Sequence, residues 1–466
     1  MHISKYARCF DIDGQHSLLL SSLTGAADIL DVDGMNSWHN LTTDTNKTDE
    51  AFLSALEERG YVFRSQEREE QLFKDMGNAF HQARKSEVLR LAICPTYQCN
   101  LACKYCYEGQ LPQTSSTSLI EEDVVHLFHV IDDTYSKRNQ RISIELTGGE
   151  PLLPKNKAVV ERVFAESVKR GYHVGVVSNG SCLASHFADL FRQFSKHISF
   201  VQVTMDGTPD IHNQRRVFRD GRGTFDYVSA SLDFLVAHRI PTRLRVNIDS
   251  SNVSHLPQLA EIILARHWTV YGCLECDVAP VLDHRGNSKY PYLTSEPDLM
   301  SKVLELRAHD PNVRRVFRFR LFRSLQHVSS LIEGDKGFPS PCVQYCEANS
   351  PNFFVFGSDG FIYACGEAIG NPEFAIGRFL PTHEIWPEQE QRWRGRSIAS
   401  IPACKECSIA GFCGGGCTFS AIVRHGSPDN AVCSGAMELL ESYCRSLAQA
   451  SIVTEDKVSA SMAKTV

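Results

Sequence analysis

Seventeen cysteines occur in this chain of 466 residues, and most of them lie in two dense groups. One group spans residues 94–106 and the other spans residues 342–433. The odd number of cysteines and an opening segment without the apolar stretch of a secretory signal argue against a disulfide scaffold. In a reducing compartment, grouped cysteines usually bind metal. The sequence therefore predicts a cytoplasmic metalloprotein.

Composition and charge limit the classes of protein to which this chain can belong. Hydrophobic residues make up 42% and charged residues 22% of the chain, which is typical of a globular protein. At roughly 100–200 residues per domain, the length predicts two to four domains. The formal net charge of -7 argues against a nucleic-acid partner. No apolar run reaches the roughly 18–20 residues of a membrane span, so no membrane partner is expected.

The first cysteine group contains the spacing Cys99-x3-Cys103-x2-Cys106. Three thiolates on one short loop can hold three irons of a cubane cluster and leave the fourth iron open to a substrate or cofactor. Thiolates also suit zinc, although a structural zinc site uses four ligands. The spacing favours an iron–sulfur cluster with one open iron, and a zinc site is the alternative.

The segments after this loop alternate between strand and helix patterns. A short strand near residues 89–93 begins six β/α units, whose later strands start near residues 141, 173, 198, 242 and 274. Strands that alternate with helices of this length indicate a parallel sheet. Six units are fewer than the eight of a closed barrel, so a partial barrel is expected. Its active site should lie at the C-terminal ends of the strands.

The cysteine loop, with Tyr105 before its last cysteine, resembles the radical S-adenosylmethionine (SAM) enzymes. This resemblance implies an α/β fold built as an open (β/α)6 TIM-like barrel. It implies that Cys99, Cys103 and Cys106 bind a [4Fe–4S] cluster whose open iron chelates SAM, and that Tyr105 lies near the adenine. Reductive cleavage of SAM would give a 5′-deoxyadenosyl radical that abstracts a hydrogen atom from the substrate.

Polar or glycine residues stand at the ends of the following strands. By the same resemblance, the glycine turn would bind the SAM amino group, the Ser-Asn pair would bind ribose, and Asp206 would face the barrel interior. Asn247 is a further candidate for SAM contact. The implied SAM-binding residues are Gly148, Gly149, Glu150, Ser178, Asn179, Asp206 and Asn247. Each motif also has an ordinary structural interpretation, either a tight turn or a helix cap.

The second cysteine group, with Gly360, resembles the SPASM domain of peptide-modifying radical SAM enzymes. SPASM domains carry two auxiliary [4Fe–4S] clusters, which would make three clusters in all. The resemblance assigns one cluster to Cys346, Cys365 and Cys417, with Cys342 as the expected fourth ligand. It assigns the other to Cys404, Cys407, Cys413 and Cys433. If Cys342 does not ligate, the first of these clusters has an open iron.

Two residues are candidates for the substrate chemistry. In some relatives a carboxylate directly after the last hairpin cysteine accepts a substrate proton, but this chain has Gly366 there and Glu367 one residue later. Cys276 begins the sixth strand, and a thiol facing the barrel would donate a hydrogen atom to a substrate radical, as peptide epimerases require. Core packing is the alternative for Cys276.

These features predict five regions. Residues 1–88 form a small N-terminal domain that either binds a leader peptide, as in many SPASM-type maturases, or caps the barrel. The other regions are the barrel (89–310), a linker (311–340), the SPASM domain (341–445) and a tail (446–466).

The expected function is modification of a ribosomally made precursor peptide that carries a leader. Two auxiliary clusters suit a net two-electron oxidation, so an intramolecular C–C, thioether or ether crosslink is the first choice. A sulfatase-type maturase that makes formylglycine, a peptide epimerase and a splicease are alternatives. A non-catalytic iron–sulfur electron carrier is the alternative from another class. Flavodoxin or ferredoxin is expected as the reducing partner.

Overall fold

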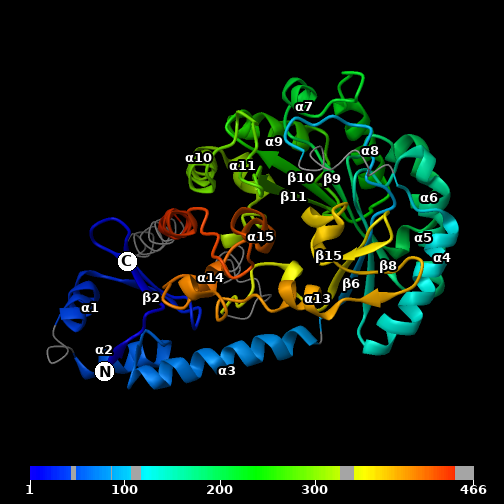
Figure 1. Ribbon diagram of the computed structural model, residues 1–466. Coiled ribbons are helices and arrows are strands. Elements are labelled where there is room, and N and C mark those ends of the chain that lie inside the picture. The colour runs from blue at the N-terminus through cyan, green and yellow to red at the C-terminus, as the bar shows by residue number, and fades with distance from the viewer. Residues whose placement is uncertain (44–48, 86, 107–116, 326–340, 447–466) are drawn as a thin grey trace.

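The computed structural model describes residues 1–43, 49–85, 87–106, 117–325 and 341–446. One sheet of eleven strands organises the described chain, in the order β12-β11-β10-β9-β8-β7-β6-β13-β14-β15-β16. Figure 1 shows helices covering the convex side of the barrel part of this sheet, with the C-terminal elements set against its opening. The predicted tail lies outside the described residues from position 447 onward.

The barrel strands confirm the predicted α/β fold with a parallel sheet. They are β6 (Leu89–Ile93), β7 (Ile142–Leu146), β8 (His173–Ser178), β9 (Ile198–Thr204), β10 (Thr242–Ile248) and β11 (Leu274–Pro280), and neighbours pair in parallel. The main helices between and after them are α4 (Glu121–Val130), α5 (Lys157–Lys169), α6 (Ala188–Gln193), α8 (Phe225–Ala237), α9 (Leu256–Ala265) and α10 (Glu296–His309).

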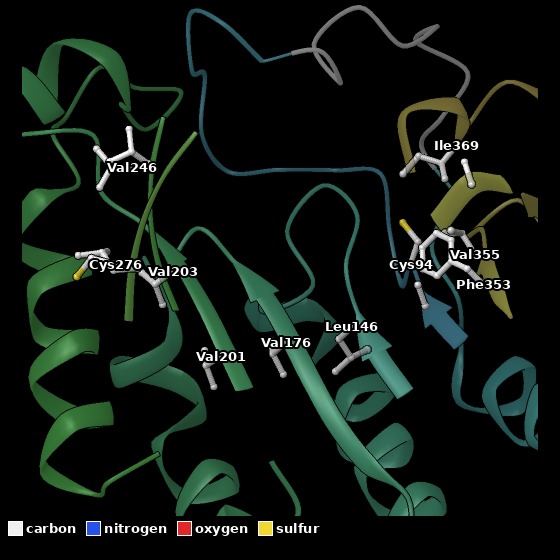
Figure 2. Packing of buried hydrophobic residues seen from close by; sticks show 14 of the residues in the cluster. Cys94, Leu146, Val176, Val201, Val203, Val246, Cys276, Phe353, Val355 and Ile369 are labelled. Atoms are coloured by element: carbon white, nitrogen blue, oxygen red, sulfur yellow. The ribbon is translucent and has the colours of Figure 1, made fainter. Parts of the chain in front are cut away.

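The strands bury an apolar face under the helices and turn polar residues toward the barrel interior. On β10, Leu244 and Val246 are fully buried in the main core, whereas Arg245 and Asn247 have the opposite parity. Figure 2 shows the buried row crossing the sheet from Leu146 through Val176 and Val201. Side chains alternate along a strand, so this parity assigns each position to one face.

The C-terminal strands extend the barrel sheet, which the sequence did not predict. Strand β13 (Phe353–Phe356) pairs in parallel with β6, and a hairpin connects it to β14 (Phe361–Tyr363). Strands β15 (Ala375–Arg378) and β16 (Glu384–Ile385) follow in antiparallel order. This pairing fixes the position of the cysteines around the hairpin relative to the barrel.

The opposite edge of the sheet also extends past the expected end of the barrel at residue 310. Helix α11 (Pro311–Val316) leads into β12 (Phe317–Arg318), which pairs in parallel with β11. Arg320 follows and binds the carboxylate of Asp277 on β11 through two nitrogen atoms, at 3.0 and 2.8 Å. The first part of the predicted linker is therefore structured, and residues 326–340 lie outside the described part.

The N-terminal residues form a sheet of β2 (Ala7–Asp11), β3 (Ser17–Ser21) and β4 (Ala27–Leu30), with a short β1–β5 pair (His2–Ile3 with Val62–Phe63). Helices α1 (Val32–Thr43), α2 (Glu50–Arg59) and α3 (Gln66–Lys85) complete this region. The Ser22 hydroxyl donates to the carbonyl of Ser408 at 2.7 Å, so the region contacts the cysteine-rich segment.

The remaining helices lie in the C-terminal part: α13 (Pro387–Arg394), α14 (Ala410–Cys413) and α15 (Thr418–His425). In the described part of the chain, no helix has both the length and the apolar character of a membrane span.

Candidate active site and cysteine array

The predicted cluster loop follows β6 and is held by the segment after α7 (Pro209–Arg215). The backbone N–H of Ala102 donates to the carbonyl of Val217 at 2.8 Å, and Leu101 bridges Phe218. Arg219 donates through Nε to the carbonyl of Cys99 at 2.9 Å. The loop is thus fixed by backbone contacts to the part of the barrel that follows the fourth strand.

The glycine turn after β7 packs directly on the cysteine loop. The N–H of Gly149 donates to the carbonyl of Thr96 at 3.1 Å. A Cβ at Gly149 would lie 2.4 Å from the carbonyl oxygen of Gln98, and one at Gly148, which has φ 112°, would lie 2.1 Å from the Cys94 sulfur. Glycine is therefore required at Gly149 by the close approach of two backbones, whether or not a ligand is bound. At Gly148 it is required by the positive φ and by the adjacent Cys94 side chain.

Glu150 links the glycine turn to the Ser-Asn turn after β8. Its carboxylate accepts hydrogen bonds from the Ser178 hydroxyl at 2.7 Å, from the backbone N–H of Asn179 at 2.6 Å and from that of Leu152 at 2.9 Å. Burial raises the pKa of Glu150, while these donors oppose the shift. The Asn179 side chain continues the network to the Cys99 sulfur at 3.6 Å.

Three of the predicted SAM-binding residues meet at one phenol oxygen. The Tyr105 hydroxyl donates to the Asp206 carboxylate and accepts from the Asn247 side-chain amide at 3.1 Å. Arg216 also donates to this oxygen at 2.7 Å. Burial raises the pKa of Tyr105 well above its ordinary value, so the phenol stays protonated. Tyr105 thereby joins the cysteine loop to the ends of β9 and β10.

Sequence reasoning missed two buried arginines beside this phenol. Arg215 forms an ion pair with Asp249 at 2.7 Å and lies over the Tyr105 ring, and Arg216 is 7% exposed. Both cations also act on Cys103, where they lower the thiol pKa against the larger effect of burial. In a sequence, two adjacent arginines at the end of a short helix are typical of a solvated surface, and only the fold shows that these two are buried.

Cys346, Cys365 and Cys417, which the resemblance assigns to one cluster, lie near one another. Burial raises the pKa of Cys365 well above its ordinary value, and the nearby Cys417 and Cys346 raise it further. Cys346 lies before β13, Cys365 follows β14, and Cys417 precedes α15. The β13–β14 hairpin and the start of α15 therefore bring together three thiols that are distant in sequence.

The second auxiliary group also assembles. Burial raises the pKa of Cys413, and so do Cys404, Cys433 and Cys342. Cys407 in turn acts on both Cys404 and Cys433. The Cys342 thiol also lies near Cys413 of this second group, and its assignment to the first group stays a prediction. The Cys342 backbone N–H donates to the carbonyl of Gly411, two residues before Cys413.

His284, which no sequence motif identified, lies beside the first auxiliary group. Its imidazole hydrogen-bonds the Cys417 side chain, contacts the Ser420 hydroxyl at 3.3 Å and lies 4.0 Å from the Glu367 carboxylate. Burial lowers the pKa of His284, but Cys417 and Glu367 outweigh it and raise the pKa to about 9. The loop after β11 carries His284 and has no recognisable pattern.

Glu367 and His284 share a small cavity with Tyr105. This cavity, of about 20 Å³, is also lined by Tyr290 and Phe419, and it adjoins a larger one of about 390 Å³ beside Cys417. One carboxylate oxygen of Glu367 has no hydrogen-bond partner among the described residues. The structure therefore brings Glu367, the predicted acid–base residue, close to Tyr105 of the cysteine loop and to His284.

Cys276 requires a correction. On β11, Cys276 pairs with Leu244 and is two residues from Val278, so these three side chains lie on the same face of the sheet. That face is the buried one that packs against the helices. Figure 2 shows Cys276 in the buried cluster with Val246 and Val203. The polar neighbours Glu275 and Asp277 take the opposite face. Cys276 therefore cannot donate a hydrogen atom to a substrate in the barrel, and its role is core packing.

The predicted cluster ligands are all cysteines. Thiolate donors suit iron–sulfur clusters and also zinc.

The comparisons with known proteins agree with this architecture. The Radical SAM superfamily model matches residues 93–263. A cysteine-type anaerobic sulfatase-maturating enzyme of Clostridium novyi is 21% identical over 360 residues, which cover 74% of this chain and 91% of that enzyme. The antilisterial bacteriocin subtilosin biosynthesis protein AlbA of Bacillus subtilis is 21% identical over 329 residues, which cover 69% of this chain and 65% of that protein.

Two solved structures share the fold. Native anSMEcpe with bound AdoMet has a TM-score of 0.61 at 19% identity and covers 79% of this chain and all of its own. SuiB of Streptococcus suis, bound to the precursor peptide SuiA, has a TM-score of 0.52 at 13% identity, covering 92% of this chain and 98% of its own. Together with the barrel and the cysteine loop, these findings make the chain a radical SAM enzyme of the group that includes sulfatase-maturating and peptide-modifying members, a family that uses a [4Fe–4S] cluster and SAM.

Proposed function

We propose that this enzyme oxidises a ribosomally made precursor peptide and forms an intramolecular crosslink between two of its side chains. The observation that carries the proposal is the cavity shared by Tyr105, Glu367 and His284. It adjoins the cavity of about 390 Å³ that Cys417 lines, and a substrate side chain would lie in that larger cavity with Glu367 and Tyr105 at its inner end. When bound, SAM and its cluster supply abstraction of a hydrogen atom from an unactivated C–H bond.

The chain supplies positioning and proton transfer. Glu367 accepts the proton that the substrate loses, because one of its oxygens is buried without a hydrogen-bond partner in the described structure. His284 hydrogen-bonds the Cys417 side chain and lies 4.0 Å from the other Glu367 oxygen, within ion-pair distance. The surrounding aromatic residues Tyr290 and Phe419 exclude water from the reacting centre.

Three clusters complete this proposal. One is held by Cys99, Cys103 and Cys106, and the SAM contacts come from the loops after β7 to β10. The auxiliary clusters use the groups around Cys365 and Cys413, and Cys342 lies near the second of these groups. The first auxiliary cluster would then be held by Cys346, Cys365 and Cys417, and Cys417 also lines the cavity of about 390 Å³. Flavodoxin or ferredoxin is the proposed reductant.

The domain assignment is part of the same proposal. The SuiB structure in complex with SuiA supports a peptide substrate, and we assign leader binding to residues 1–88. The barrel is taken to extend to residue 325, because β12 completes the edge of its sheet. The SPASM domain begins at residue 341.

The test is anaerobic turnover with SAM, dithionite and a candidate precursor peptide encoded beside the gene, in D2O. Mass spectrometry follows the peptide and 5′-deoxyadenosine together. Loss of two hydrogens with a new crosslinked fragment supports the proposal. Gain of one deuterium without a crosslink indicates epimerisation and contradicts it, and cleavage of the peptide chain indicates a splicease.

Formylglycine formation is the second candidate. It is supported by the similarity to the sulfatase-maturating enzyme of Clostridium novyi, which extends over 91% of that enzyme. Glu367 would again accept the proton, although Gly366 occupies the position next to Cys365. A sulfatase peptide with a central cysteine or serine replaces the precursor in the assay. A product aldehyde captured by a hydrazide probe identifies this activity.

A further inference from the structure

Arg396 is a buried cation without a carboxylate partner. Its side chain is 2% exposed, and it follows α13 in the segment before Cys404. Among the residues that the structure describes, no acidic side chain forms an ion pair with it. Arginine keeps its proton even when buried, so the charge remains inside the protein. A buried charge that meets only neutral groups is strongly unfavourable unless an anion lies nearby.

The guanidinium instead gathers backbone carbonyl groups from two cysteine-bearing segments. It donates to the carbonyl of Gly416 at 2.7 Å and to that of Gly415 at 2.6 Å, just before Cys417. It also donates to the carbonyls of Pro428 at 2.6 Å and Asn430 at 3.0 Å, which precede Cys433. One side chain therefore connects the loop of Cys413 and Cys417 to the loop of Cys433.

The glycine run explains how these carbonyls reach the guanidinium. Gly414, Gly415 and Gly416 have φ values of 68°, 85° and 78°, a left-handed stretch that side chains other than glycine rarely adopt. A Cβ at Gly415 would lie 3.5 Å from Nη1 of Arg396 and 3.6 Å from the Cys404 sulfur. The cation and a thiol of the second auxiliary group thus flank the same glycine.

Members of both auxiliary groups lie close to this cation. Burial lowers the pKa of Arg396, and the thiolates of Cys404, Cys417, Cys346 and Cys413 oppose that shift. Cys346 and Cys417 belong to the first group, and the other two belong to the second. A cubane with thiolate ligands carries net negative charge, and that charge is one determinant of its reduction potential.

We propose that Arg396 is the shared counter-cation of the two auxiliary clusters and raises the reduction potential of both. This inference rests on the proposed cluster assignment. In this proposal the negatively charged clusters are the anions that balance the buried guanidinium, because no carboxylate of the described residues does so. A cation favours the reduced, more negative state of a neighbouring cluster, so removal of the charge makes each potential more negative.

The experiment isolates the auxiliary clusters. In the full chain with Cys99→Ala, Cys103→Ala and Cys106→Ala, the potentials are measured by anaerobic spectroelectrochemistry, and iron and sulfide are quantified. In this background, Arg396→Gln is expected to shift the reduction equilibrium at least tenfold, or about 59 mV for a one-electron couple. Arg396→Lys, which keeps the charge, is expected to hold the potentials close to those of the background.

Arg392→Gln is the matched control. It removes the same charge from α13, but Arg392 is only partly buried and donates to the Gly426 carbonyl at 3.3 Å. Its potentials should not change. Unchanged potentials in Arg396→Gln, or equal shifts in the Gln and Lys variants, would overturn the proposal.

Cluster loss is also decisive. If Arg396→Gln loses iron and Arg396→Lys keeps it, the charge is required and the proposal stands. If both lose iron, the hydrogen-bond geometry rather than the charge matters, and the proposal fails. A background protein without auxiliary iron would contradict the cluster assignment itself, which separates that failure from a failure of the Arg396 role.

Discussion

The hydroxyl of Ser178 donates a hydrogen bond of 2.7 Å to the carboxylate of Glu150, and this contact ties the end of the third barrel strand to the turn after the second. Both Glu150 oxygens are occupied by donors of the chain itself. The side chain therefore positions two loops of the predicted SAM site, and each of its oxygens has a donor.

Glu150→Gln is expected to destabilise the enzyme. The glutamine side chain has one acceptor oxygen in place of two. Its NH2 group would therefore face a backbone N–H or hydroxyl donor, and that donor would lose its acceptor. A buried group left without its partner costs about 1–3 kcal/mol. Urea unfolding of the variant measures this loss, and Glu122→Gln on the exposed side of α4 is the control. An unchanged free energy of unfolding would show that the network relaxes without cost.

Gly149→Ala is expected to disrupt the cysteine loop. The new methyl group would lie 2.4 Å from the Gln98 carbonyl oxygen and 2.5 Å from that of Tyr97, and both are backbone atoms. Forced overpacking of this kind costs about 1–3 kcal/mol, and the displaced loop should lose its cluster. Thermal unfolding and iron content after anaerobic reconstitution measure the two effects.

Gly77→Ala provides the opposite control within the same chain. Gly77 lies inside α3, and a Cβ added there would meet no described atom within 4 Å. Alanine in a helix interior is better than glycine by roughly 0.5–1 kcal/mol, so this variant should be more stable than the natural enzyme. Equal losses in both variants would contradict the specific packing argument for Gly149.

The barrel strands could be predicted from the sequence, because the pattern that identifies each strand lies within the strand itself. The strand expected at 89–93 matches β6, and the strands expected from residues 173 and 242 match β8 and β10. Each of these segments has its own alternation and its own turn residues. The parallel pairing of β13 with β6 joins residues far apart in the chain, and no local pattern encodes such a contact.

Some of the site residues could also be predicted from local patterns, whereas others could not. Cysteine spacing identified the thiols of each group, but the position of Cys342 depends on a backbone contact with Gly411. His284 and Arg396 lie in loops without a motif, and only tertiary packing places them beside Cys417. The orientation of Cys276 could have been predicted from the sequence. Glu275 and Asp277 on either side of it mark the polar face of β11, so the thiol lies on the apolar face.

His284→Ala is expected to uncouple SAM cleavage from substrate oxidation. The variant loses the group between Cys417 and Glu367, but it leaves the contacts of the cysteine loop in place. Loss of a residue that assists proton transfer slows product formation by about 100-fold or more. The ratio of 5′-deoxyadenosine to modified peptide should rise accordingly. His186→Ala, which changes an exposed histidine, should keep the natural ratio.

Cys99→Ala is expected to abolish SAM cleavage while iron at the C-terminal array survives. A loop with two thiolates no longer holds the cluster that binds SAM. Quantification of 5′-deoxyadenosine and of iron in the same preparation tests both parts. Cys9→Ala lies outside both cysteine groups and serves as the control. Retained cleavage in Cys99→Ala would refute the assignment of this loop.

Glu296 should make stability depend on pH. It lies at the start of α10 beside the cavity of about 390 Å³ and is 6% exposed. Burial raises its pKa from 4.5 to about 7, and His284 opposes the shift. The unfolded chain releases this proton near pH 4.5, whereas the folded protein keeps it until about pH 7.

Stability should therefore fall as the pH rises through this window and become independent of Glu296 above it. The full difference corresponds to about 3 kcal/mol at 1.36 kcal/mol for each pKa unit. Glu296→Gln cannot ionise, so the natural enzyme should lose stability relative to this variant between pH 4.5 and 7. Free energies of unfolding at several pH values test this difference. Glu261→Gln, on an exposed side of α9, should run parallel to the natural enzyme. If Glu296→Gln runs parallel as well, the buried carboxyl does not titrate in this range.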